Sequence, residues 1–125
     1  ATTDMTFPEW SLSLIGQMHE AGVPIGAGTD TPIGFAVPGY SLHNELEMLV
    51  RAGLSPIEAL RSATLRPAEF FGLENEMGTV DVGRLADLVL LNANPLEDIH
   101  NTRTVHAVVT KGQLLTSEAL AALIR

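Results

Sequence analysis

The sequence predicts an α/β protein in which a buried parallel strand and its covering helices precede a small antiparallel sheet. In the first half of the chain, helical patterns alternate with a short apolar run. From about residue 77 onward, short apolar runs are separated by turn residues instead. A hydrophobic fraction of 46% in 125 residues indicates one well-packed interior rather than a disordered chain.

The first helix is expected over residues 7–22. Pro8 suits its first turn, and Gly22 stands where helices commonly end. The apolar run of residues 23–29 follows at once and is rich in small residues, which is typical of a parallel strand buried on both faces. A helix followed directly by such a strand is the order of elements found in parallel α/β sheets.

Asp30 comes directly after this predicted strand. The carboxyl ends of strands are where α/β barrels and open α/β sheets keep their active sites, so Asp30 is a candidate catalytic residue. Gly26 and Gly28 leave room beside the strand for a closely approaching backbone or ligand. The alternative is that Asp30 caps the next turn, because Asp-Thr-Pro is favourable turn chemistry. Both interpretations stay open at this point.

Further helices are expected after the Gly- and Pro-rich loop of residues 31–40. Ser41 opens an amphipathic segment over residues 42–52. Ser55-Pro56-Ile57-Glu58 is a capping box with proline at the first helical position, which predicts a helix through about Thr64. One more helical turn is expected over residues 67–71.

The remaining residues are expected to form short strands and a final helix. The strands are predicted over residues 78–81, 86–91, 104–110 and 113–115. Lys111-Gly112 is a tight turn that joins the last two as a hairpin. We therefore expect a three- or four-stranded antiparallel piece, followed by a helix in the Ala- and Leu-rich tail of residues 117–124.

Composition argues against several classes of partner. With a net charge of −8 and only seven scattered basic residues, a nucleic-acid partner is not expected. No apolar run is long enough to cross a bilayer and no signal peptide is visible, so no membrane partner is expected. The absence of cysteine excludes disulfides and thiolate metal sites, which fits a cytoplasmic protein.

A series of short motifs runs in a fixed order over roughly residues 10–115. The motifs are Ala21-Gly22-Val23-Pro24, Gly28-Thr29-Asp30, the helical text from Leu42 to Leu60, Arg66-Pro67-Ala68, Gly78-Thr79-Val80, the run from Gly83 to Leu91, and Asn94-Pro95-Leu96. This order resembles the C-terminal third of an amidohydrolase-superfamily enzyme, nearest to the imidazolonepropionase-like and Xaa-Pro-dipeptidase-like branch. The ordered series carries the resemblance, since Gly-Thr-Asp alone is common.

The resemblance implies a fold that this chain supplies only in part. Such enzymes are (β/α)₈ barrels, or TIM barrels, with a small β-sandwich built from both ends of the chain. Residues 1–75 would form the C-terminal part of the barrel, with its last strand and following helices. Residues 76–125 would form the C-terminal part of the composite sandwich with a terminal helix. The chain is then expected to be a C-terminal fragment.

The resemblance also implies a metal-dependent hydrolase that cleaves a C–N bond in an amide, a cyclic amide or a dipeptide. Asp30 would match the eighth-strand aspartate, which binds the catalytic metal and takes a proton from the hydrolytic water. A divalent metal, here zinc as one or two ions, polarises the scissile carbonyl and lowers the pKa of bound water from roughly 15.7 towards 7. The carboxylate can then pass the proton to the departing amine.

The other metal ligands implied by the resemblance lie on strands that this chain does not contain. They are a His-x-His pair, a bridging carboxylated lysine and two further histidines. The histidines present show neither His-x-His nor His-Glu-x-x-His spacing: His19, His43, His100 and His106. One carboxylate cannot hold zinc in a three-ligand catalytic arrangement. We therefore expect the 125-residue chain alone to bind no metal and to be inactive.

Four residues near Asp30 are candidates to bind a small-molecule substrate. Thr29, Thr31 and Tyr40 border Asp30 in the sequence. His43 lies at the start of the next helix, near the barrel mouth by the resemblance, where it either touches substrate or is simply solvated. Three other acidic residues are expected to have structural roles. Glu45 and Glu47 should lie on the wet face of an amphipathic helix, and Asp87 should bond turn backbone near Gly83.

Two functions remain open. The chain is either part of a metal-dependent hydrolase, or a non-catalytic truncated module or remnant that only associates with other chains. In both cases the missing neighbouring strands leave open sheet edges. The expected partner is therefore the remainder of the same polypeptide or another copy, as an oligomer or a strand-swapped form.

Overall fold

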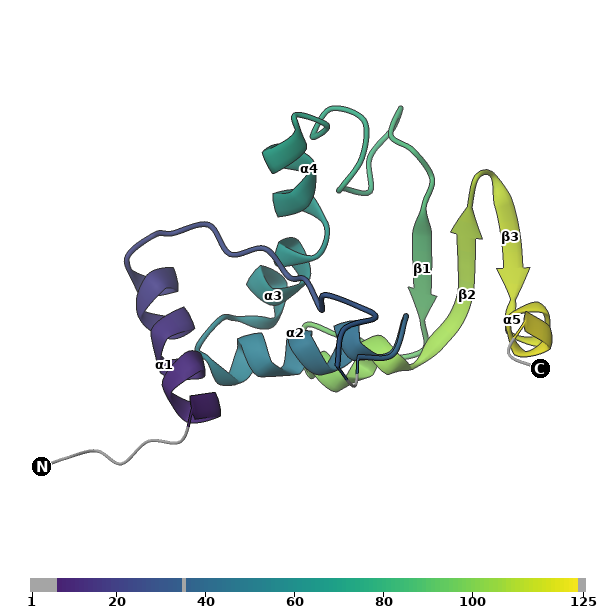
Figure 1. Ribbon diagram of the computed structural model, residues 1–125. Coiled ribbons are helices and arrows are strands. Elements are labelled where there is room, and N and C mark those ends of the chain that lie inside the picture. The colour runs from purple at the N-terminus through teal and green to yellow at the C-terminus, as the bar shows by residue number, and fades with distance from the viewer. Residues whose placement is uncertain (1–6, 35, 124–125) are drawn as a thin grey trace, which may run out of the picture. The chain divides into compact units, whose positions relative to one another are not determined.

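The computed structural model describes residues 7–34 and 36–123. The chain forms two compact units, Ala1–Ala63 and Thr64–Arg125. The first unit is helical, and the second holds the sheet (Figure 1). The mixed α/β composition is confirmed. The expected division at residues 75 and 76 concerns membership of a barrel and a sandwich, which these units do not test, and it stays a prediction.

The first unit is built from three helices: α1 (Phe7–Glu20), α2 (Ser41–Arg51) and α3 (Pro56–Ser62). Helix α2 contacts both α1 and α3. Gly16 allows α1 to approach closely, because a Cβ at this position would collide with the carbonyl oxygen of Ala52 at the end of α2. The buried residues of this core are Leu46, Leu49, Leu54, Ala59 and Ser62.

Local signals placed these helices correctly. Helix α1 ends at Glu20, and Gly22 follows in the left-handed conformation at φ 78°, which glycine adopts without strain. The capping box of α3 is present, since Glu58 Oε2 accepts hydrogen bonds from the Ser55 amide at 2.8 Å and from Ser55 Oγ at 2.5 Å. The same carboxylate lies 3.4 Å from His19 Nε2 and so joins α3 to α1.

The parallel strand predicted over residues 23–29 is wrong for this chain. Residues 23–30 belong to no helix or strand. The strands found among residues 7–34 and 36–123 all belong to one β1-β2-β3 sheet, so none pairs with this segment. Its backbone is hydrogen-bonded to a helix instead, since the Ala27 amide donates to the carbonyl of Ser62 in α3 at 2.9 Å.

The second unit opens with α4 (Leu65–Phe71) and contains the sheet of β1 (Leu88–Leu91), β2 (Val105–Thr110) and β3 (Gln113–Thr116). The strands pair antiparallel in the order β1-β2-β3, which confirms the predicted three-stranded piece. A 3₁₀ helix, η1 (Ile99–Arg103), contacts β1, and the final helix α5 (Ser117–Leu123) contacts β2 and β3.

The strand predicted over residues 78–81 is also wrong. These residues belong to no helix or strand, and the amide of Leu85 donates to the carbonyl of Glu76 at 2.7 Å to close this loop. Gly78 packs against the start of α4, where an added Cβ would lie 3.1 Å from the Leu65 Cα. The Gly-Thr-Val sequence therefore indicates a close backbone approach at Gly78, which has a positive φ, rather than a strand.

Asp87 fastens the β2–β3 turn to the start of β1. Its Oδ1 accepts from Thr110 Oγ1 at 2.9 Å and from the Lys111 amide at 3.2 Å. Lys111 and Gly112 both have positive φ, at 50° and 75°, as a two-residue hairpin turn requires. The expectation that Asp87 bonds backbone near Gly83 is therefore corrected: the bonded turn is the β2–β3 turn.

Replacing Asp87 by alanine should lower the free energy of unfolding by about 1 kcal/mol, because it removes both bonds to the β2–β3 turn. Urea unfolding followed by circular dichroism measures this. Asp81→Ala is the matched control, since Asp81 bonds only the adjacent Val82 amide among the contacts of its carboxylate described here. It should change stability by less than about 0.5 kcal/mol. Equal effects of the two substitutions would contradict the turn-fastening role.

The capping box predicts a pH dependence. Hydrogen bonds from the Ser55 side chain and backbone hold the pKa of Glu58 below its ordinary value of 4.5. This carboxylate therefore stabilises the fold above pH 4.5, and its contribution is lost as pH falls through the lowered folded-state pKa. The stability advantage of the native chain over Glu58→Gln should shrink on acidification below 4.5, measured by urea unfolding. In a Ser55→Ala background the same comparison should vary less with pH.

Candidate functional site

Asp30 begins a tight turn and presents an exposed side chain. Its φ of 52° is left-handed, a conformation that aspartate tolerates better than most residues. Its carbonyl accepts the amide of Ile33 at 2.9 Å, which closes the turn. A turn therefore begins at Asp30 and is closed by its backbone carbonyl, whereas capping of this turn by the Asp30 side chain stays a prediction. The carboxylate of Asp30 is not needed for this bond, so Asp30 stays a candidate catalytic residue.

The two threonines that flank Asp30 are bonded to each other. Thr29 Oγ1 and Thr31 Oγ1 lie 2.5 Å apart, and both residues are half-buried. Because a hydroxyl donates one hydrogen bond and accepts two, each keeps some bonding capacity for a ligand. Their bond bridges Asp30 from one side to the other and restricts the conformations of the segment that carries it.

Tyr40 and His43 lie at the start of α2. Tyr40 is 57% exposed, and His43 is half-buried. The His43 amide donates to the Tyr40 carbonyl at 3.1 Å, and Ser41 Oγ accepts from the Val37 amide at 2.8 Å. These bonds order the loop end that leads from the Asp30 turn into α2. Substrate contacts by Thr29, Thr31, Tyr40 and His43 stay predictions.

Glu45 is the residue near this site that sequence reasoning placed wrongly. It is half-buried, and its Oε1 accepts the amide of Gly28 at 2.7 Å, two residues before Asp30. A signal was available in the sequence: Glu45 follows the spacing of the apolar residues of α2, at positions 42, 45, 46 and 49. The expectation that Glu45 and Glu47 only form the wet face of α2 is therefore corrected for Glu45, which bonds the backbone of the Asp30 segment, although this bond is exposed.

The described residues do not make a metal site by themselves. No group of three or more His, Cys, Asp or Glu side chains lies together among residues 7–34 and 36–123. The zinc arrangement implied by the sequence resemblance needs at least three protein ligands, which this part of the chain does not bring together. A metal could be held at Asp30 only together with further ligands.

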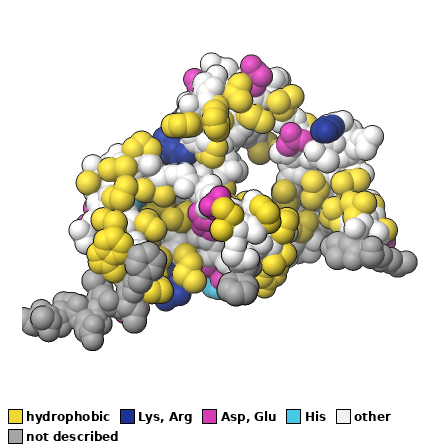
Figure 2. Space-filling view, viewed as in Figure 1, with side chains coloured by type: hydrophobic (Ala, Val, Ile, Leu, Met, Phe, Trp, Pro, Cys, Tyr) yellow, Lys and Arg dark blue, Asp and Glu magenta, His cyan; other side chains and the backbone are white. Residues whose placement is uncertain are grey.

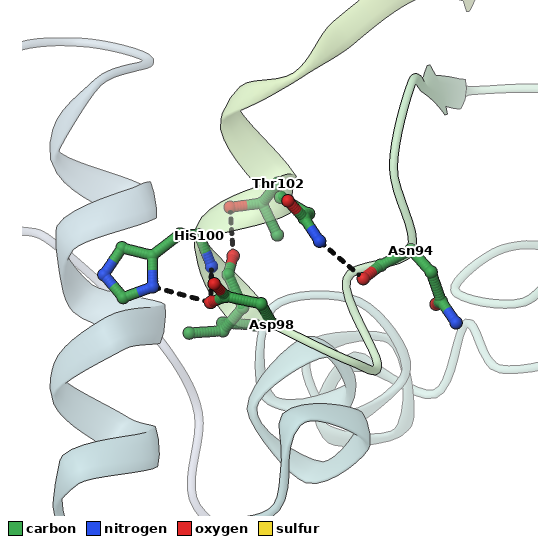
Figure 3. A network of polar contacts seen from close by, with 6 residues as sticks. Asn94, Asp98, His100 and Thr102 are labelled. Atoms are coloured by element: carbon green, nitrogen blue, oxygen red, sulfur yellow. Dashed lines mark hydrogen bonds and ion pairs between the residues drawn. The ribbon is translucent and has the colours of Figure 1, made fainter.

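A network of polar contacts lies around η1 and serves that helix (Figure 3). Asp98 caps η1 by accepting from the His100 amide at 2.9 Å, and its Oδ1 also lies 2.6 Å from His100 Nδ1. These bonds, from the backbone first and the ring second, hold the pKa of Asp98 below its ordinary value. Thr102 Oγ1 donates to the Ile99 carbonyl at 2.9 Å. One carboxylate and one imidazole explain a capped helix rather than a catalytic centre.

Comparisons with known proteins place this site in context. Residues 12–115 match the sequence profile of the amidohydrolase family. The imidazolonepropionase of Symbiobacterium thermophilum is 33% identical over 106 residues, which cover 82% of this chain and 25% of that protein.

Solved structures agree with this match. A Xaa-Pro dipeptidase, crystallised with methionine bound in its active site, superposes with a TM-score of 0.76 at 31% identity, over 85% of this chain and 25% of that one. Molinate hydrolase superposes with a TM-score of 0.72 at 31% identity, over 80% and 25%. The chain thus spans about a quarter of the length of these relatives. None of its described helices is long and apolar enough to cross a membrane.

Proposed function

The chain belongs to the amidohydrolase family, and we propose that it supplies the C-terminal part of a metal-dependent hydrolase that cleaves a C–N bond. The sequence resemblance is thereby confirmed. The observation that best supports the proposal is the placement of Asp30. Its exposed side chain stands on a closed turn inside the matched residues, with two ligand-capable hydroxyls beside it.

Asp30 is the acid–base residue in this proposal. A carboxylate within hydrogen-bond reach of an attacking water accepts its proton and returns it to the leaving amine. Asp30 would also supply one oxygen ligand to a divalent metal, zinc as one or two ions, in the completed protein. The substrate is a small amide, cyclic amide or dipeptide, and Thr29, Thr31, Tyr40 and His43 are the residues proposed to contact it.

The names of the relatives support the hydrolytic class. One is a dipeptidase and another is a hydrolase. Because the described residues bring no three metal-ligating side chains together, catalysis requires residues beyond those described here. We propose that the 125-residue chain alone is inactive and gains activity only in the completed protein.

A second candidate is a non-catalytic module that associates with other chains. It is favoured by the large apolar side chains that reach the surface (Figure 2). Val89 and Leu90 are adjacent on β1 and are 58% and 59% exposed. Successive side chains on a strand point to opposite faces, so neither face of the sheet is fully covered at β1 by the described residues. Both candidates therefore share a need for a covering partner.

Asp30→Asn tests the catalytic assignment. The substitution should leave the fold nearly unchanged, because the side chain is exposed and asparagine tolerates the left-handed φ of this turn. In an active protein that contains these residues, it should lower turnover at least about 100-fold, since it removes the proton acceptor. Steady-state kinetics on a dipeptide or amide substrate measures this. Asp81→Asn is the control at another exposed aspartate, and near-full activity of Asp30→Asn would refute the assignment.

Association is tested by size-exclusion chromatography with light scattering at low micromolar concentration. The partner is proposed to be the remainder of the same polypeptide or another copy, joined as an oligomer or in a strand-swapped form. We expect a mass above 13.3 kDa, because exposed apolar residues such as Val89 and Leu90 are covered only by association. A well-behaved 13.3 kDa monomer that unfolds cooperatively would contradict this expectation.

A further inference from the structure

We infer that Glu45 is a positioning residue for Asp30. It acts through the backbone, because its carboxylate holds the Gly28 amide at 2.7 Å, two residues before Asp30. Glu45 itself need touch neither substrate nor metal in this role. Its effect on turnover rests on the proposed function, whereas its effect on the backbone does not.

Two consecutive amides of the segment are held by two different helices. The Ala27 amide donates to the carbonyl of Ser62 on α3 at 2.9 Å, and the Gly28 amide donates to Glu45 on α2. A segment that belongs to no sheet needs such partners to keep one conformation. The bond to Glu45 is the stronger kind, because an ionised acceptor roughly doubles the strength of a hydrogen bond.

Both anchors belong to helices that form the core of the first unit. Ser62 is 1% exposed, and its Oγ donates to the carbonyl of the fully buried Ala59 at 2.6 Å. Glu45 is followed on α2 by Leu46, and one turn later by Leu49, which are both buried. Glu45 itself is half-buried and its bond to the Gly28 amide is exposed, so the two buried leucines fix the helix that carries Glu45 rather than its carboxylate.

The position of Gly28 determines where Asp30 lies. Only Thr29 separates them, and its hydroxyl is bonded to that of Thr31 across Asp30 at 2.5 Å. On the far side, the bond from the Ile33 amide to the Asp30 carbonyl closes the turn. The Asp30 carboxylate is thus carried on a short loop whose leading end is fixed by Glu45. Without Glu45, the Gly28 amide loses this partner. The leading end of the loop is then anchored to the helices only by the bond from the Ala27 amide to the Ser62 carbonyl.

The structural test is nuclear magnetic resonance on the ¹⁵N-labelled chain, alone or with the partner that completes it. In the native chain, the Gly28 amide proton should exchange slowly with solvent. Glu45→Gln should keep slow exchange, because the amide oxygen of glutamine still accepts a hydrogen bond. Glu45→Ala should speed the exchange of the Gly28 amide. Glu47→Ala, on the same helix, should leave it unchanged.

The kinetic test uses the active protein and separates this inference from the proposed function. Glu45→Ala should lower kcat by up to about 100-fold with little change in KM, because it displaces a reacting group rather than a binding one, and Glu45→Gln should restore most of the loss. If Asp30→Asn loses turnover while Glu45→Ala keeps it, the positioning role is wrong. If Asp30→Asn has no effect while the Gly28 amide still depends on Glu45, the proposed function fails and the positioning of the segment stands. An unchanged Gly28 amide in Glu45→Ala overturns the inference outright.

Discussion

The hydrogen-bonding requirement of the backbone over residues 23–30 is the constraint on which the first unit depends. A segment without strand partners needs other hydrogen bonds to keep one conformation, and this segment has no neighbouring strand among the described residues to provide them. Helices α2 and α3 meet the requirement through Glu45 and the Ser62 carbonyl. The two helices therefore form the core and hold the Asp30 turn at the same time.

The helices could be predicted from the sequence because their signals are local. Pro8, Gly22 and the Ser55–Glu58 capping box act within one or two helical turns, and each end that they indicated lies within about two residues of the observed one. A strand exists only when it is paired, and pairing is not local. Residues 88–91 and 105–116 find partners within the chain and form the predicted sheet, whereas residues 23–29 and 78–81 find none and remain irregular.

The parts of the candidate site that follow from the order of residues along the chain could be predicted. The parts that depend on hydrogen bonds between distant residues could not. Asp30 follows a small-residue apolar run, and its exposed position on a turn agrees with that pattern. Glu45 was misplaced because a charge was taken as a mark of solvent, although its spacing put it on the apolar side of α2. Asp87 was misplaced because its partners, Thr110 and Lys111, lie more than twenty residues away.

The proposed function joins two features that are incomplete among the described residues. The lone carboxylate of Asp30 lacks the further ligands that a catalytic metal needs, and β1 exposes apolar side chains on both of its faces. The chain spans about a quarter of its relatives' length, so one longer or assembled protein could supply both the ligands and the cover. Folding stability and activity would then be gained in the same step. The non-catalytic alternative requires only the cover, so a partner that raises stability without bringing metal ligands to Asp30 separates the two.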